Sequence, residues 1–496
     1  MLMTMLFPIV VNAEEGYYYV GDQTIWDLSN KTYKFSKMDD GKTWTLTMPI
    51  DSSDDFQIAP LSVESWNDSR YKVAVGSSGL TGMMNFSPFD GTNFSVNTET
   101  PGSYTIKIVP SEMTYEITLD EKTYKDGDIF TYSAGTCDLK LKVISAEEKK
   151  CMIVDCTYTN IGYITIPSEA EGFKIVSIGP KAFMNRLSLV KKVTISDGIT
   201  NIGESAFCLA PDLIEVKMAN SVTSIDSRAF AQCYKLESID LSKNLKKIGS
   251  SAFFECNKLN YVNIPSLYAW LNIEFDGYLS NPLNYAHKLH INSWEETDIT
   301  IPFGISKIND FAFYNSNITS VSFGNTVVSI GENAFANCGK LSSISIPNSI
   351  KTISKSAFQG CSGIEVVTLD CEDVDSWFRE SNLKTVMFGN NVKRIGLDAF
   401  YGCKGLTSID FPEGLLSIGQ SAFQNCSGLT KINFPESLTD IGGGAFENCS
   451  GLTGINLPKG LTNIGWDTFK GCSGLTSITV PEGVTSIGEG AFYGCI

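Results

Sequence analysis

The side chains best suited to acid–base or metal chemistry are scarce in this chain, which contains only two histidines, His287 and His290. They lie three residues apart in a segment expected to be a strand, where residues three apart point to opposite faces. A metal ion shared by the two is therefore not expected, and neither is any other cofactor. The sequence has no glycine-rich phosphate loop, nucleophile elbow or Cys-x-x-Cys pair. We expect no catalytic residues, no metal site and no enzymatic activity.

Cysteine is the more abundant reactive residue, with fourteen in the chain. Nine of them follow an isoleucine by eight residues: Cys233, Cys256, Cys338, Cys361, Cys403, Cys426, Cys449, Cys472 and Cys495. This register predicts a stacked column of small buried thiols, each able to donate its S–H to a turn carbonyl. Disulfides between neighbours in the column are the alternative. Cys137, Cys151 and Cys156 lie outside the column, and the pattern leaves their state open.

A repeat places these cysteines. Its consensus is Ile-Gly-x-x-Ala-Phe-x-x-Cys-x-x-Leu, followed by alternating apolar residues and often proline. The opening isoleucine occurs at 178, 202, 225, 248, 308, 330, 353, 395, 418, 441, 464 and 487, most often 23 residues apart. A fixed period of this length predicts a solenoid, in which each coil buries its apolar side against its neighbours. Solenoids offer extended binding surfaces rather than pockets that converge reactive groups.

The coil that contains residues 475–492 illustrates the expected local structure. Ile478 and Val480 alternate with Thr479, which predicts a strand with one buried face, and Pro481 ends that strand. The glycine at 488 lies at a position that elsewhere holds Asp226, Asn309 or Ser354, and all four residue types suit a tight turn, some with positive φ. We expect a helical turn through Ala491 and Phe492. Burying a large apolar side chain contributes about 1.5–3 kcal/mol of stabilising free energy. This gain offsets the loss of backbone entropy only when neighbouring coils cover both sides of a coil.

The repeat resembles the BspA-type leucine-rich repeats of bacterial surface proteins over about residues 125–496. The resemblance implies an α/β leucine-rich-repeat solenoid that is rich in strands, and a role in adhesion. Implied partners are host matrix proteins or bacterial surface proteins. We assign residues 178–496 to the repeats and residues 121–177 to their N-terminal cap. The sequence stops partway through a coil, at Cys495 and Ile496, so we expect either a longer natural chain or a second chain that covers this uncapped end.

Two irregular units, near residues 265–304 and 371–388, interrupt the period and resemble the degenerate units of the same family. Their tryptophans, Trp270 and Trp377, are candidate exposed anchors for a partner, or they pack at bends in the core. The outward column of the expected sheet is small and polar, which is also what a plain solvated face would show. Tyr261 and Met387 are therefore the further candidates for partner binding.

Residues 14–120 read as short strands separated by turns, which predicts an all-β sandwich. The segment from Gly41 to Ala59, with Trp26 upstream, resembles the starch-binding domains of SusE- and SusF-type outer-membrane proteins, although the lipidation cysteine of those proteins is missing. The resemblance implies glycan binding. Candidate sugar contacts are Trp26, Trp66 and Tyr71; the alternative is that these rings pack inside the sandwich.

The N-terminal segment, the lengths of the apolar stretches and the net charge limit where the protein is expected to act and what it can bind. Residues 1–13 contain an apolar run that ends at Asn12-Ala13, which predicts a secretory signal peptide with a truncated n-region, or else a short buried strand. No apolar stretch is long enough for a transmembrane helix. A formal charge of −17 argues against nucleic acid as a partner.

Together these features predict a secreted or cell-surface, non-enzymatic binding protein whose solenoid contacts a protein. Capture of a starch-like polysaccharide by the sandwich, with the repeats as a stalk, is the competing hypothesis. A structural spacer is the third.

Overall fold

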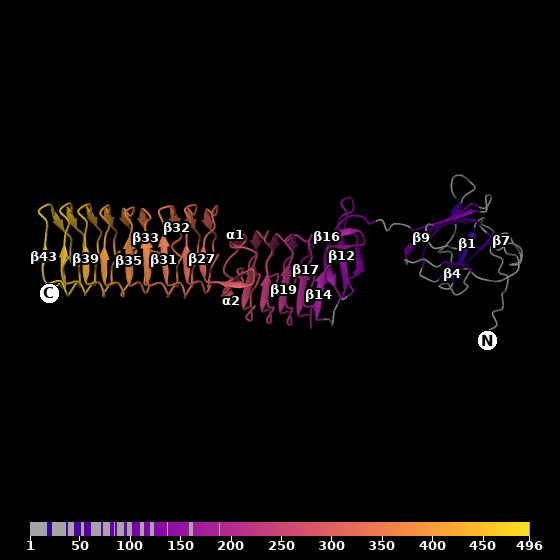
Figure 1. Ribbon diagram of the computed structural model, residues 1–496, viewed down its shortest axis with the longest axis horizontal. Coiled ribbons are helices and arrows are strands. Elements are labelled where there is room, and N and C mark those ends of the chain that lie inside the picture. Colours follow the sequence, from indigo (N-terminus) through magenta and orange to yellow (C-terminus); the bar gives the residue numbers. More distant parts are fainter. Residues whose placement is uncertain are drawn as a thin grey trace. The chain divides into compact units, whose positions relative to one another are not determined.

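The computed structural model divides into two compact units, residues 1–124 and 125–496 (Figure 1). In the second unit the structure describes residues 125–495 apart from 136, 158–161 and 188. In the first unit it describes the backbone of ten strands together with Tyr124.

The ten strands of the first unit form two antiparallel sheets of five strands each. One contains β1 (Tyr17–Gly21), β4 (Asp54–Pro60), β5 (Tyr71–Lys72), β7 (Asn85–Phe86) and β8 (Phe94–Val96). The other contains β2 (Ser36–Lys37), β3 (Trp44–Ile50), β9 (Gly102–Val109), β10 (Thr114–Leu119) and β6 (Leu80–Met83). The prediction of short strands within residues 14–120 is confirmed for these ten segments. Packing of the two sheets as a sandwich stays a prediction.

The second unit is a solenoid with two columns of short parallel strands along its axis (Figure 1). The first column contains β16 (Phe173–Ile178), β18 (Asn201–Ile202), β20 (Ser224–Ile225), β22 (Lys247–Ile248), β24 (Glu274–Phe275), β28 (Lys307–Ile308), β30 (Ser329–Ile330), β32 (Thr352–Ile353), β34 (Asp373–Val374), β36 (Arg394–Ile395), β38 (Ser417–Ile418), β40 (Asp440–Ile441), β42 (Asn463–Ile464) and β44 (Ser486–Ile487). The second contains β14 (Tyr163–Ile166), β17 (Lys192–Ile195), β19 (Glu215–Met218), β21 (Ser238–Asp240), β23 (Tyr261–Ile264), β25 (Leu289–Ile291), β27 (Asp298–Thr300), β29 (Ser320–Ser322), β31 (Ser343–Ile346), β33 (Val366–Leu369), β35 (Thr385–Phe388), β37 (Ser408–Asp410), β39 (Lys431–Asn433), β41 (Ile455–Asn456) and β43 (Ile478–Thr479).

The strand register confirms the solenoid that the period predicts. The opening isoleucines are direct neighbours, as in the pairs Ile178–Ile202 and Ile395–Ile418. The register also reveals coils that the consensus does not show. Phe275 pairs with Ile248, and Val374 pairs with Ile395, so each irregular unit contains one more coil in which another residue replaces the isoleucine.

Stacked phenylalanines fill the core behind the strands. Phe400, Phe423 and Phe446 are fully buried, and their rings stack with centroids 5.1 and 5.3 Å apart. The exposure of the opening isoleucines shows how neighbouring coils bury one another. Ile464, which has a coil on both sides, is 1% exposed, whereas Ile487 in the last coil is 54% exposed. Each coil is therefore buried by the coils beside it, as the period implies.

The Ala-Phe segment is not the helical turn that we expected but a series of tight turns. The N–H groups of Asp398, Phe400 and Gly402 donate to carbonyls of the following coil at 2.8–3.1 Å. Asp398 and Gly402 have φ values of +55° and +72°. An α-helix keeps its N–H groups within its own segment, so these turns replace a helix with bonds between coils. The residue seven positions after the opening isoleucine has a positive φ in all twelve repeats, and we call this set the left-handed column.

The glycine that follows the opening isoleucine has a different role from the one predicted. Gly419, Gly442 and Gly488 are absent from the positive-φ residues. A Cβ at Gly442 would lie 2.5 Å from the backbone nitrogen of Gln420 in the preceding coil. The position therefore needs glycine for the close approach of two coils rather than for a left-handed turn.

The thiol column has the predicted form. Cys426 donates its S–H to the carbonyl of Phe400 at 3.2 Å, and Cys449 and Cys472 repeat the contact with Phe423 and Phe446 at 3.2 Å. All of the cysteines are free thiols in this structure. Burial raises the pKa of Cys472 to about 12, so this thiol stays protonated and remains a donor.

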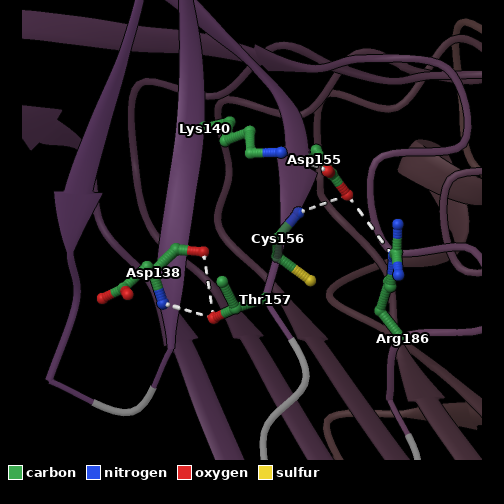
Figure 2. Close-up of polar contacts among 6 residues, drawn as sticks. All are labelled: Asp138, Lys140, Asp155, Cys156, Thr157 and Arg186. Carbon is green, nitrogen blue, oxygen red and sulfur yellow. Dashed lines mark hydrogen bonds and ion pairs between the residues drawn. The ribbon is translucent and has the colours of Figure 1, made fainter.

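A three-stranded antiparallel meander precedes the first regular coil. It consists of β11 (Ile129–Ser133), β12 (Asp138–Ser145) and β13 (Lys150–Cys156), and β13 then pairs in parallel with β16, beside which β15 (Glu169–Ala170) adds an antiparallel edge. Figure 2 shows that Asp155 on β13 faces two cations. Its carboxylate lies 3.0 Å from Lys140 on β12 and 3.4 Å from Arg186 in the first turn of the solenoid. Asp155 thus joins the meander to the first coil.

The first prediction concerns this junction. Burial acts to raise the pKa of Asp155, but the hydrogen bond from Lys140 and the positive charges of Arg186 and Lys140 outweigh it and lower the pKa. A carboxyl with a lowered folded-state pKa stabilises the fold above its unfolded value, about 3.9, and loses that contribution as the pH falls. Asp155→Asn should therefore cost up to about 1 kcal/mol at pH 7.

Urea unfolding at several pH values tests this expectation. The difference between the natural protein and Asp155→Asn should be constant near neutral pH and shrink below about pH 4. Lys140→Gln should reduce the pH dependence without abolishing it, because Arg186 remains. A difference that stayed constant to pH 2 would mean that the charge of Asp155 contributes nothing.

Candidate interaction surface

The outward face of the second strand column carries an ordered set of charged and aromatic side chains between β17 and β26 (Trp294–Glu296). We call it the ladder face and define it by Lys192, Glu215, Lys217, Asp240, Tyr261, Asn263, His290 and Glu295. Successive parallel strands place these residues side by side, because inward and outward positions alternate along each strand. Val216 and Ile239, which alternate with them, are fully buried.

Ion pairs connect the first strands of the ladder face. Glu215 lies 3.1 Å from Lys192 and 3.3 Å from Lys217, and Lys217 lies 3.8 Å from Asp240. Asn263 continues the series by donating to Asp240 at 3.1 Å. Burial tends to raise the pKa of Glu215, but the hydrogen bonds from the two lysines lower it overall, so this carboxylate stays ionised. The side chains are therefore held in fixed positions by their neighbours.

An aromatic pair follows the charged series. The rings of Tyr261 on β23 and His290 on β25 stack with centroids 4.4 Å apart and an interplanar angle of 10°. Burial lowers the pKa of His290, which favours the neutral imidazole at neutral pH. The next strand, β26, pairs His290 with Glu295 and carries Trp294, whose side chain is 77% exposed. Aromatic residues in such positions are typical of interface hot spots.

The charges of the ladder face balance. Lys192 and Lys217 of this face, together with the adjacent Lys288, offset Glu215, Asp240 and Glu295. Lys288 lies 3.7 Å from Glu295. The whole chain has a formal charge of −17. An approaching acidic protein is therefore repelled less by this face than by the average surface of the molecule.

Trp270 and Trp377 are not exposed anchors. Trp270 lies in α1 (Leu267–Leu271), is 0% exposed and donates its indole N–H to the carbonyl of Ala312 at 3.0 Å. Trp377 is 8% exposed and donates to the carbonyl of Ile353 at 3.3 Å. Both rings fill the core where the irregular coils, including α2 (Leu283–Ala286), depart from the regular packing. We therefore withdraw both as contact residues. They follow the alternative hypothesis, in which they pack at bends in the core.

The other predicted residues fall into two groups. Met387 on β35 faces outward with 49% exposure, next to Thr368 in the register, and remains a candidate. Of the proposed sugar contacts, Trp26 and Trp66 lie outside the described residues. Tyr71 begins β5, where the structure describes the backbone alone.

Sequence reasoning missed several exposed residues. His290 and Glu295 could have been found by continuing the outward column past Asn263 into the irregular unit. Trp294 pairs with Ile291 and so belongs to the other side of the strand. Trp466 is 49% exposed and lies over Gly443, where a Cβ would meet the indole at 2.4 Å. The sequence feature that could have indicated this exposed ring is the glycine run at 442–444, one coil before Trp466, because glycine leaves room for the indole.

The fold and this face define the class: a leucine-rich-repeat solenoid with a structured strand surface. The sequence profile of the BspA type leucine rich repeat region (six copies) matches residues 156–275, 288–377 and 372–496, which is more than half of the chain. The chain belongs to this family. The family is in general one of protein-binding and adhesion proteins rather than enzymes.

Solved structures of similar proteins include a leucine-rich repeat protein from Bacteroides ovatus, 26% identical, with a TM-score of 0.44 over 68% of this chain and 95% of that one. A leucine rich cell surface protein from Faecalibacterium prausnitzii is also 26% identical, with a TM-score of 0.32 over 74% and 92%. The pneumococcal vaccine antigen PcpA is 16% identical, with a TM-score of 0.26 over 60% and 95%. No curated protein matches the chain. Among the described residues, no helix has the length and apolar character to span a membrane.

Proposed function

We propose that the chain is a cell-surface adhesion protein whose ladder face binds a protein partner. The observation that carries the proposal is the Tyr261–His290 stack at the end of a charge-balanced, hydrogen-bonded series of side chains. Rigid aromatic side chains lose little conformational entropy on binding, and fixed polar neighbours supply specificity. Membership of a family of protein-binding solenoids supports the same assignment.

The second prediction tests the two candidate anchors. Tyr261→Ser replaces the ring with the residue that Ser238 supplies at the paired position, and Met387→Thr copies Thr368 in the same way. Both changes should leave the coil intact, because the neighbouring coil already holds the substituted residue. Binding of the full chain to the best of three immobilised matrix proteins (collagen, fibronectin and laminin) should weaken about tenfold or more with Tyr261→Ser.

A control on the opposite side of the coil separates surface effects from folding. Leu397 is 52% exposed on the turn side, and Gln420 occupies the same position one coil later, so Leu397→Gln is the matched variant. It should bind as tightly as the natural protein. Unchanged binding in a variant with both Tyr261→Ser and Met387→Thr, or no binding to any of the three proteins, would refute the ladder face as their contact surface.

A further inference from the structure

A trough of about 1110 Å³ runs along the corner of the solenoid between the turn side and the second strand column. Six successive coils line it, from Glu365 to Gly471. At about 4.8 Å per coil this is a length of roughly 25 Å. The trough therefore suits an extended chain that lies along the solenoid axis. It does not include any residue of the ladder face.

One of the coils that line the trough has a shortened corner. In regular coils three residues separate the left-handed position from the buried leucine, as between Asn425 and Leu429. In the coil of Val374 only two residues separate Glu380, which has a φ of +54°, from Leu383. Asn382 takes the place of the usual two-residue corner and donates to the carbonyl of Ser362 at 2.9 Å. The corner of this coil is thus one residue shorter than the corners of the coils that follow.

Carboxamides of the left-handed column form the floor. Asn448 donates its Nδ2 to Oδ1 of Asn425 at 3.0 Å, and its own Oδ1 lies over Gly471, where a Cβ would be only 2.4 Å from it. A carboxamide has two N–H donors and an oxygen with two lone pairs, so this bond leaves most of its capacity available. Hydroxyls of Ser427 and Ser450 lie in the same trough.

One aromatic ring lies among these polar groups. Tyr401 lines the trough, and the guanidinium of Arg379 lies 4.4 Å from its ring centroid. Arg379 itself pairs with Asp398 at 2.8 Å and does not line the trough. The cation therefore fixes the ring orientation without occupying the trough.

The charges and the side-chain types decide the ligand class. The lining carboxylates, Glu365 and Glu380, are matched by two ammonium groups, Lys384 and Lys404, and the Lys384–Glu365 pair is 2.7 Å apart. A balanced trough gives no advantage to a polyanion or a polycation. The described lining contains no aliphatic side chain, whereas grooves that hold peptides provide apolar pockets. Amides, hydroxyls and one ring are the groups that hydrogen-bond and stack on sugars.

We propose that this trough binds a neutral linear oligosaccharide along the solenoid axis. The sugar hydroxyls bond to the carboxamides of Asn425 and Asn448, and a sugar face lies against Tyr401. The proposal is independent of the protein partner at the ladder face, because the two surfaces share no residue.

The third prediction uses substitutions that the repeat already contains. Glycine occupies the left-handed position at 402 and 471, so a variant with both Asn425→Gly and Asn448→Gly keeps the backbone and removes the amides. Gln424 stands at the position of Tyr401 one coil later, so Tyr401→Gln removes the ring. The full chain is titrated by calorimetry with maltohexaose, cellohexaose and chitohexaose. At least one should bind, and each variant should raise its Kd about tenfold.

Matched controls place the same changes outside the trough. Asn337→Gly alters the left-handed column elsewhere, and Tyr493→Gln removes a ring that is 74% exposed. Both should keep the affinity of the natural protein, as should Tyr261→Ser on the ladder face. The proposal is overturned if no hexasaccharide binds with a Kd on the order of 1 mM or tighter. It is equally overturned if binding survives both trough variants, which would locate the sugar elsewhere in the chain.

Discussion

Replacing Phe423 with alanine should lower the free energy of unfolding of the solenoid by about 3–5 kcal/mol. The ring is fully buried, stacks on Phe400 and Phe446, and contacts Phe411 edge to face with centroids 5.7 Å apart. Its removal leaves a cavity, because the backbone hydrogen bonds between the coils fix their spacing and limit how far they can close around the missing ring. Because stability in a repeat array is the sum of coil and interface terms, the loss falls on two adjacent interfaces.

Urea unfolding monitored by circular dichroism measures this effect. A weakened interface in the middle of the array is also expected to split the unfolding transition in two, since coils on either side then unfold separately. Phe492→Ala is the matched control, because Phe492 is half-buried and, among the described residues, stacks on Phe469 alone. It should cost clearly less. Equal losses for the two variants would show that the stack does not couple the coils.

Gly442→Ala should destabilise the solenoid by about 1–3 kcal/mol, although alanine is intrinsically easier to order than glycine. The new Cβ would meet three backbone atoms of the preceding coil at 2.5–2.9 Å. Asp226 and Asn309 occupy the equivalent position in other coils, so the coils can move apart locally. That movement strains the hydrogen bonds on both sides, and for this reason we expect a moderate loss rather than an unfolded protein.

Gly454→Ala provides a comparison of opposite sign. Nothing lies within 4 Å of a Cβ at Gly454, and its φ is not positive. This substitution should be neutral or stabilise by about 0.4–1 kcal/mol, because it restricts the unfolded chain. The two variants are compared by thermal and urea unfolding. A Gly442→Ala protein as stable as the Gly454→Ala protein would contradict the close approach as the reason for glycine.

The regular part of this fold follows from the sequence because one residue type recurs at one position. Each opening isoleucine predicts a strand, a neighbour and a buried side chain, and the pairs Ile202–Ile225 and Ile418–Ile441 agree with that prediction. Cys426 and its equivalents were placed correctly for the same reason. Such positions see nearly the same surroundings in every coil, so a repeated residue has a repeated environment.

The irregular coils could not be predicted in this way, because their structure depends on contacts with particular neighbours. Val374 replaces isoleucine and lies 21 residues from both Ile353 and Ile395. Its position midway in the 42-residue gap was the available indication that an extra coil lies there. The burial of Trp270 depends on the carbonyl of Ala312, 42 residues away, and no local pattern indicates it. The short corner between Glu380 and Leu383 departs from the consensus by one residue, and the consensus does not indicate the trough that this coil helps to line.

The contacts that join successive coils have a mechanical consequence. The strands lie across the solenoid, so the hydrogen bonds from Phe400 and its equivalents run along its length. A force that pulls along this direction opens those bonds one coil after another. Each released coil of about 23 residues extends from about 5 Å to roughly 80 Å. Under tension the solenoid would lengthen coil by coil and dissipate mechanical work, while the coils that stay folded keep their surfaces intact.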